Sequence, residues 1–187
     1  MALTRASRRE VRRTNVRWKI FLVLMGIVAL NYIDRGSLSV ALPLIAHELE
    51  ISKEVTGLIL SSFFWTYALM QIPGGWLADR FKPRIVAASS CVGWGIAQGL
   101  TAAATTVPAL VAFRMLLGAA EGPLVPTGGK LNAMWLPARE RGRGAVLLDG
   151  GVPLGAAVGG AAISGLIVLT GSWRIAFVIA GLATVLA

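Results

Sequence analysis

The segment WKIFLVLMGIVALNYIDRGSLSVALPLI, residues 18–45, has the length and apolar character of a membrane-crossing helix, yet Asp34 and Arg35 stand side by side inside it. A helix crosses the hydrocarbon core of a bilayer with about 20 predominantly apolar residues. A charge near the bilayer centre costs at least roughly 2.5–3.5 kcal/mol, and such residues generally face a bundle interior or a water-filled cavity. The segment therefore predicts a transmembrane helix with a functional pair of charges.

The composition of the whole chain also indicates a membrane protein. Of its 187 residues, 56% are hydrophobic and 14% are charged, whereas about a quarter of the residues in a soluble domain are charged. A single cysteine and a single histidine exclude a disulfide within the chain and a Cys/His metal cluster. No nucleophile–base set is present, so we expect neither an enzyme nor a bound cofactor or metal.

Further apolar stretches follow residues 18–45 without a linker, and together they predict an all-α bundle of six helices. The last stretch holds only about 15 residues, short of a full crossing, so we expect a truncated sixth helix. Glycines crowd the fifth stretch and allow close contact between helices. The five further spans are expected near residues 55–77, 85–104, 107–136, 144–169 and 173–187.

Fourteen of the 18 basic residues fall on one side of this bundle. They occupy the first 19 residues, the loop between the second and third spans, and the connection between the fourth and fifth. The positive-inside rule places these segments in the cytoplasm, so residues 1–17 are expected to form a cytoplasmic basic tail at the cell (inner) membrane. The net charge of +9 follows from this topology, and we do not expect a nucleic-acid partner.

Four charged residues lie well inside the expected spans: Asp34, Arg35, Arg114 and Glu121. Arg114 and Glu121 are two turns apart and share a helix face. A rise of about 1.5 Å per residue places Glu121 at the depth of Asp34, so the four charges are expected to lie close together near the midplane. Ion pairs that only fasten helices are the alternative, although buried pairs stabilise weakly.

The functional interpretation gives the two residue types different tasks. Arginines are permanently charged and suit a bidentate grip on a carboxylate, whereas intramembrane acids can carry protons. Tyr67 and Gln71 share a face of the second span and can hydrogen-bond a polar substrate, although packing explains them equally well. Asp149 is nearer the cytoplasmic end of its helix, and we predict no separate site there.

Several motifs resemble the major facilitator superfamily. GGWLADRFKPR (74–84) is similar to its G-x-L-x-D-R-x-x-x-R cytoplasmic signature, and RMLLGAAEG (114–122) to the pattern of its fourth helix. NYIDRGSLSVALP, QIPGGWLADR and ERGRGAVLLDGGVPLG resemble the anion:cation symporters, which include bacterial sugar-acid transporters and organic-anion carriers. The resemblance implies two six-helix halves, of which this chain holds most of the first and lacks the C-terminal half.

The resemblance also implies roles for individual residues. Asp34 and Glu121 match the protonation sites of the sugar-acid members, and Arg35 and Arg114 match the residues that contact the substrate carboxylate. Tyr67 matches a residue that lines the sugar site. The residues of the cytoplasmic signature are expected to act in gating and not in substrate binding: Gly75, Asp79, Arg80 and Arg84.

The expected function is proton-coupled symport of a small organic anion, such as a sugar acid of the galactonate, glucarate or hexuronate type. Val152 replaces a glutamine of the galactonate-type carrier, which argues against galactonate itself, and Gly128 and Gly129 replace polar residues of relatives. The alternatives are a carrier of another carboxylate, such as tartrate, phthalate or an aromatic acid, and a non-transporting half-length protein.

Overall fold

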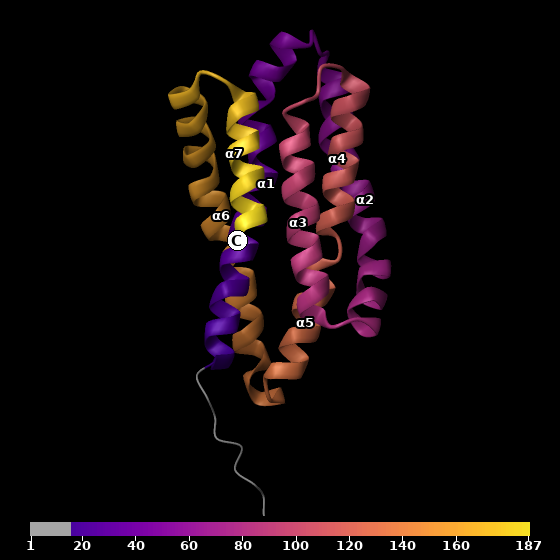
Figure 1. The fold of residues 1–187 in the computed structure, drawn as a ribbon, viewed down its shortest axis with the longest axis vertical. Coiled ribbons are helices and arrows are strands. Elements are labelled where there is room, and N and C mark those ends of the chain that lie inside the picture. Colours follow the sequence, from indigo (N-terminus) through magenta and orange to yellow (C-terminus); the bar gives the residue numbers. More distant parts are fainter. Residues whose placement is uncertain (1–15) are drawn as a thin grey trace, which may run out of the picture.

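The computed structural model describes residues 16–187, and all regular structure in that range is helical (Figure 1). The expected all-α membrane fold is confirmed. Residues 1–15, most of the expected basic tail, lie outside the described range. The helices are α1 (Val16–Glu48), α2 (Lys53–Arg80), α3 (Pro83–Thr101), α4 (Val107–Glu121), α5 (Leu124–Trp135), the short 3₁₀ helix η1 (Ala138–Glu140), α6 (Arg141–Thr170) and α7 (Trp173–Leu186).

Four stretches are long and apolar enough to cross a membrane: Val16–Glu48, Lys53–Arg80, Val107–Trp135 and Ala138–Thr170. Helix α3 is not among these stretches, and it contains buried polar residues, among them Ser90 and Gln98. Helix α7 is apolar but shorter. The set has the length and composition of a multi-pass membrane protein.

The fourth expected span is built from two helices. Helix α4 ends at Glu121 and α5 begins at Leu124, with a turn at Gly122 and Pro123 between them. Pro123 has no N–H group for the helical hydrogen-bond ladder, and Pro126 lacks one a turn later. The break therefore falls directly after one of the charged residues singled out by the sequence.

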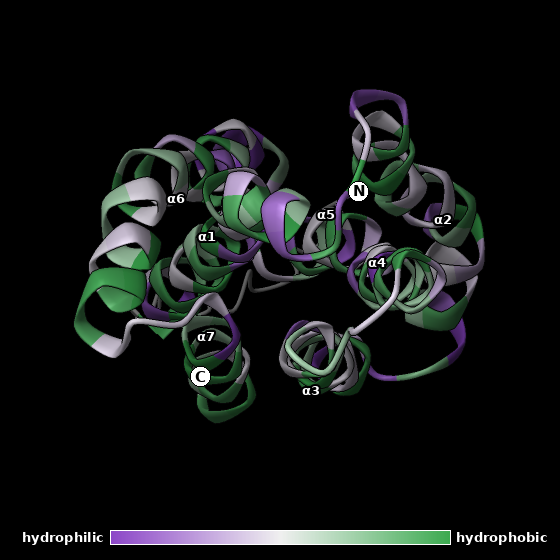
Figure 2. Cartoon of the chain, turned by 90° about the horizontal axis from the view of Figure 1, so that it is seen from above, coloured by the Kyte–Doolittle hydropathy of each residue, from purple (hydrophilic) through white to green (hydrophobic). Residues whose placement is uncertain are grey.

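The helices form two groups. Helix α1 packs against α6 and α7, α2 packs against α4, and α3 lies between the groups in contact with α4 and α7. Figure 2 shows this arrangement from above, with α5 near the centre. Glycines make the α1–α6 contact close, since a Cβ atom on Gly155 would collide with the carbonyl oxygen of Ala29.

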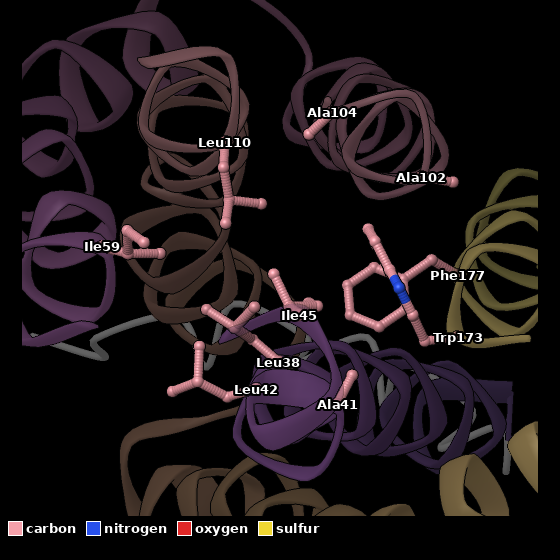
Figure 3. Close-up of a cluster of buried hydrophobic side chains, with 10 residues drawn as sticks. All are labelled: Leu38, Ala41, Leu42, Ile45, Ile59, Ala102, Ala104, Leu110, Trp173 and Phe177. Carbon is pink, nitrogen blue, oxygen red and sulfur yellow. The ribbon is translucent and has the colours of Figure 1, made fainter. Parts of the chain in front are cut away.

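A cluster of buried apolar side chains packs together at one end of the bundle (Figure 3). Trp173 and Phe177 pack edge to face, with ring centroids 5.6 Å apart. Glu48 at the end of α1 accepts a hydrogen bond from the Trp173 indole at 2.7 Å and pairs with Arg174 at 2.6 Å. These contacts fix the last turns of α1 against α7. The buried core residues are Leu38, Ala41, Leu42, Ile45, Ile59, Ala102, Ala104, Leu110, Trp173 and Phe177.

Candidate functional site

The clearest feature of the bundle interior is an ion pair between α1 and α4. Nε of Arg35 donates to Oε2 of Glu121 at 2.8 Å. The Glu121 side chain is fully buried, whereas the Arg35 side chain retains 18% exposure. A carboxylate taken out of water requires such a partner, because an isolated buried charge is strongly destabilising.

Aromatic rings hold the Arg35 guanidinium in place. Its central carbon lies 4.3 Å from the ring centroid of Tyr67 and 5.1 Å from the centroids of Tyr32 and Phe63. A cation within about 6 Å of an aromatic ring is attracted to the electron-rich face of that ring. Glu121 takes the Nε hydrogen, and the Tyr67 side chain also interacts with the guanidinium, so a ligand that binds Arg35 would share its donors with these two residues.

Arg35 and Glu121 both line a cavity of about 280 Å³. Helices α1 and α2 contribute Asn31, Tyr32 and Tyr67 beside the ion pair. Because the fourth span breaks directly after Glu121, the residues of α5 form a separate wall, and α6 closes the cavity. The lining residues from these two helices are Leu124, Val125, Gly128, Gly129, Asn132, Ala145, Leu148, Asp149 and Val152.

Asp34 faces a different part of the bundle. Its Oδ2 accepts hydrogen bonds from the indole nitrogen of Trp94 at 3.0 Å and from the hydroxyl of Thr184 at 2.7 Å. Gln98 adds a neighbouring bond, from its amide nitrogen to the Ser37 hydroxyl at 2.6 Å. Asp34 is therefore oriented toward α3 and α7, and it is 1% exposed.

Arg114 is buried in the bundle and forms no salt bridge with either acid among the described residues. It is 2% exposed, and its charge interacts with those of Glu121 and Asp34. Its Nε and Nη2 atoms make no hydrogen bond with residues 16–187. Together with Arg35 it borders a second, smaller cavity of about 100 Å³, so the larger cavity is lined by Arg35 and not by Arg114.

Tyr67 and Gln71, the two polar candidates on α2, differ in their position relative to the larger cavity. The Tyr67 ring covers the Arg35 guanidinium and lines the larger cavity. Gln71, one turn later, is half-buried and is not a lining residue of that cavity. Asp149, for which the sequence predicted no separate site, does line it.

Two of the signature residues, Gly75 and Asp79, lie where α2 contacts α5. The Lys130 ammonium group pairs with the Asp79 carboxylate at 2.9 Å and also donates to the carbonyl oxygen of Ala78. A Cβ atom on Gly75 would lie 3.7 Å from Pro126 of α5. The remaining signature residues, Arg80 and Arg84, are exposed.

Sequence reasoning missed the partners of Asp34 and of Asp79. One signal was present: Ser90, Trp94, Gln98 and Thr101 recur at helical spacing and form a buried polar stripe on α3. Lys130 was counted only as one of many basic residues near the cytoplasmic side. Its bond to Asp79 depends on the tertiary contact between α2 and α5.

Comparisons with known proteins agree on the kind of molecule. A family model described as Major Facilitator Superfamily matches residues 24–187. A probable galactarate/D-glucarate transporter of Bacillus subtilis is 33% identical over 94% of this chain and 40% of its own length. A probable sulfoacetate transporter of Cupriavidus necator is 37% identical over 90% of this chain and 39% of its own length. The chain thus spans about 40% of the length of these relatives.

The fold matches a solved structure as well. A bacterial homologue of the human lysosomal transporter Spinster, in an inward-facing and occupied conformation, superposes with a TM-score of 0.83 at 24% identity. The match covers 93% of this chain and 43% of that one.

Proposed function

The chain belongs to the major facilitator superfamily, and on that premise we propose that the complete protein is a proton-coupled symporter of a small organic anion, a sugar acid in the first place. The observation that carries the proposal is the Arg35–Glu121 pair at the wall of the cavity. This pair brings a fixed cation, an acid that can take up a proton, and space for a ligand to one place.

Arg35 is the proposed anchor of the anion. Its terminal nitrogens present the planar, bidentate geometry that suits a carboxylate. The rings of Tyr32, Phe63 and Tyr67 restrict the guanidinium, so little conformational freedom is lost when the anion binds. The relative from Bacillus subtilis, a probable galactarate/D-glucarate transporter, supports a sugar acid as the ligand.

The proposed coupling of anion binding to proton binding follows from competition between the anion and the Glu121 carboxylate for Arg35. An anion that binds the guanidinium weakens its hold on the Glu121 carboxylate. A carboxylate left buried with a weakened partner is stabilised by taking up a proton, because its charge is no longer compensated. Binding of the anion and binding of the proton at Glu121 thus favour each other, as reciprocal linkage requires.

The other site residues take supporting roles in this proposal. Asp34 is a second proton-coupling acid on the α3–α7 side, and Arg114 supplies positive charge near the two acids and serves as the second substrate arginine. Gln71 does not line the cavity, so it would contact only a substrate that extends beyond the cavity. In the proposed topology the N-terminus is cytoplasmic, the protein lies in the inner membrane, and the signature residues Gly75, Asp79, Arg80 and Arg84 act in gating.

A different organic anion is the second candidate. The relative from Cupriavidus necator is a probable sulfoacetate transporter and is 37% identical over 90% of this chain. A sulfonate, like a carboxylate, presents oxygens that accept hydrogen bonds from a guanidinium. Arg35 would therefore serve either anion.

The test is uptake by the complete protein reconstituted in liposomes under an imposed pH difference. A panel should include gluconate, glucarate, glucuronate, sulfoacetate and a neutral sugar as the control. We expect at least one sugar acid to accumulate against its gradient and to do so only while the pH difference lasts. Accumulation of sulfoacetate alone would favour the second candidate, and accumulation of no anion would refute the proposal.

A further inference from the structure

We infer that Asp149 makes the carrier select singly charged polyhydroxy acids over acids with a carboxylate at each end, in contrast to the two dicarboxylic sugar acids for which the relative from Bacillus subtilis is named. The inference rests on the proposed function and specifies its substrate class. It starts from the charges of the cavity. Three charged residues line it, namely Arg35, Glu121 and Asp149, and Arg35 is the only basic one among the described lining residues.

Asp149 and Arg35 lie at different levels of the cavity. The register of α6 against α1 shows this, since a Cβ atom on Gly151 would meet the backbone of Met25, and one on Gly159 would meet Ile33. Asp149 is therefore level with the residues just before Met25. Asp149 precedes Gly151 by two residues, so its level is near Val23, and with a rise of about 1.5 Å per residue this is roughly 18 Å along the helix axis from the Arg35 backbone.

The long Arg35 side chain shortens that separation. Helical side chains lean toward the N-terminus, and the guanidinium of Arg35 lies against the ring of Tyr32, almost one turn nearer to the level of Asp149. Both residues line one continuous cavity. An extended acid held by its carboxylate at Arg35 would thus direct its far end toward Asp149.

The chemistry of Asp149 decides which far end is accepted. An ionised carboxylate only accepts hydrogen bonds, so a terminal hydroxyl of the ligand can donate to it and a second carboxylate cannot. Asp149 forms no ion pair within residues 16–187 that would offset its charge. A second carboxylate that came within about 6 Å of Asp149 would be repelled by an amount equivalent to a roughly 3- to 100-fold loss of affinity, for effective dielectric constants between those of water and a protein surface.

The wall of α5 does not compensate this charge. Gly128 and Gly129 line the cavity, and a Cβ atom on Gly129 would meet no atom within 4 Å. This part of the wall therefore contributes space and no cationic side chain. The cavity therefore offers Arg35 to an anionic group of the ligand and Asp149 to a hydrogen-bond donor of the ligand.

Gluconate and glucarate provide a matched test, because they differ only in whether the sixth carbon is a hydroxymethyl group or a carboxylate. Initial uptake of each labelled acid should be measured with the complete protein in liposomes, for the wild type and for Asp149→Asn, which keeps the shape and removes the charge. Glu54→Gln removes an exposed acid from the start of α2, away from the cavity, and serves as the charge control. Asp149→Ser is the second variant if the amide variant is not recovered in folded form.

The wild type and Glu54→Gln are expected to prefer gluconate at least threefold. Asp149→Asn is expected to raise the uptake of glucarate relative to gluconate at least threefold. Equal uptake of both acids by the wild type, or an unchanged ratio in both Asp149 variants, would overturn the inference while leaving the proposed function intact. Uptake of neither these acids nor any other anion of the panel would overturn the proposed function, and this inference with it.

Discussion

Replacing Glu121 by glutamine is expected to strengthen anion binding and to abolish proton-driven accumulation at the same time. The Glu121 carboxylate occupies the Nε hydrogen of Arg35 at 2.8 Å, so a ligand that needs this guanidinium competes with it. A glutamine keeps the size of the side chain and one oxygen acceptor. It removes the charge that competes with the ligand and the group that would carry the proton.

The size of the gain follows from the bond that the ligand must weaken. The glutamine oxygen still accepts from the charged guanidinium, so the variant removes only the negative charge of the acceptor. Opposite unit charges about 4 Å apart attract by about 1 kcal/mol in water and by more in a less polar surrounding. At 1.4 kcal/mol per factor of ten, relief of about 1 kcal/mol should make the anion bind at least about fivefold more tightly.

Two measurements on the complete protein check this prediction. Equilibrium binding in detergent gives the affinity, and uptake into liposomes under a pH difference gives the accumulation, with counterflow as proof that the variant is folded and mobile. Asp34→Asn is the matched control: Asp34 bonds to Trp94 and Thr184 and not to Arg35, so this variant should lose accumulation without the gain in affinity. Weaker binding by Glu121→Gln, or uphill accumulation at the wild-type level, would refute the competition argument.

Three further predictions concern orientation, packing and gating. A phosphatase fusion after His47 should be active and one after Arg84 inactive, because the basic segments are expected in the cytoplasm. Gly155→Ala should lower the thermal unfolding temperature by forcing α6 off α1, at a cost of about 1–3 kcal/mol, whereas Gly160→Ala, with open space around its Cβ position, should not. Lys130→Gln should slow transport several-fold without changing anion affinity, because it removes the ion pair between α2 and α5.

Each of these has a clear contrary result. The reverse fusion pattern would invert the topology. Equal unfolding temperatures of the two glycine variants would show that α1 and α6 can separate without loss. A change in affinity with unchanged transport rate in Lys130→Gln would place that lysine in binding and not in gating.

The sequence predicts the fold well because lipid imposes a simple rule on it. A span needs a long apolar run, and five of the six expected ranges coincide with single helices that extend at most a few residues beyond or short of them. Helix α3 shows where the rule weakens: it is not among the stretches that are long and apolar enough to cross a membrane, and it buries polar residues such as Gln98, which donates to Ser37 of α1. The break between α4 and α5 at Pro123 depends on the backbone chemistry of proline, which a hydropathy pattern does not contain.

The candidate site was predictable only in its parts. Periodicity and depth bring Arg35 and Glu121 to the same level, and the structure joins them. The same reasoning predicted Asp34 near Glu121, and the two carboxylates interact electrostatically, but it did not predict that Asp34 is hydrogen-bonded by Trp94 of α3 and Thr184 of α7. Depth along a helix follows from counting residues, whereas the direction of a side chain around the axis depends on which helices become neighbours, and that is decided by the whole bundle.

Helix α1 carries its two adjacent charges on different sides, one toward α2 and α4 and the other toward α3 and α7. Because they are consecutive residues on one stiff rod, they cannot be adjusted separately. A roll or slide of the α1 backbone at Arg35 would also displace the Asp34 backbone, next to the side chains of Trp94 and Thr184 that donate to its carboxylate. Because both residues belong to the same turn of α1, a movement of the helix on the α2–α4 side would also be felt on the α3–α7 side, without a chain of intervening contacts.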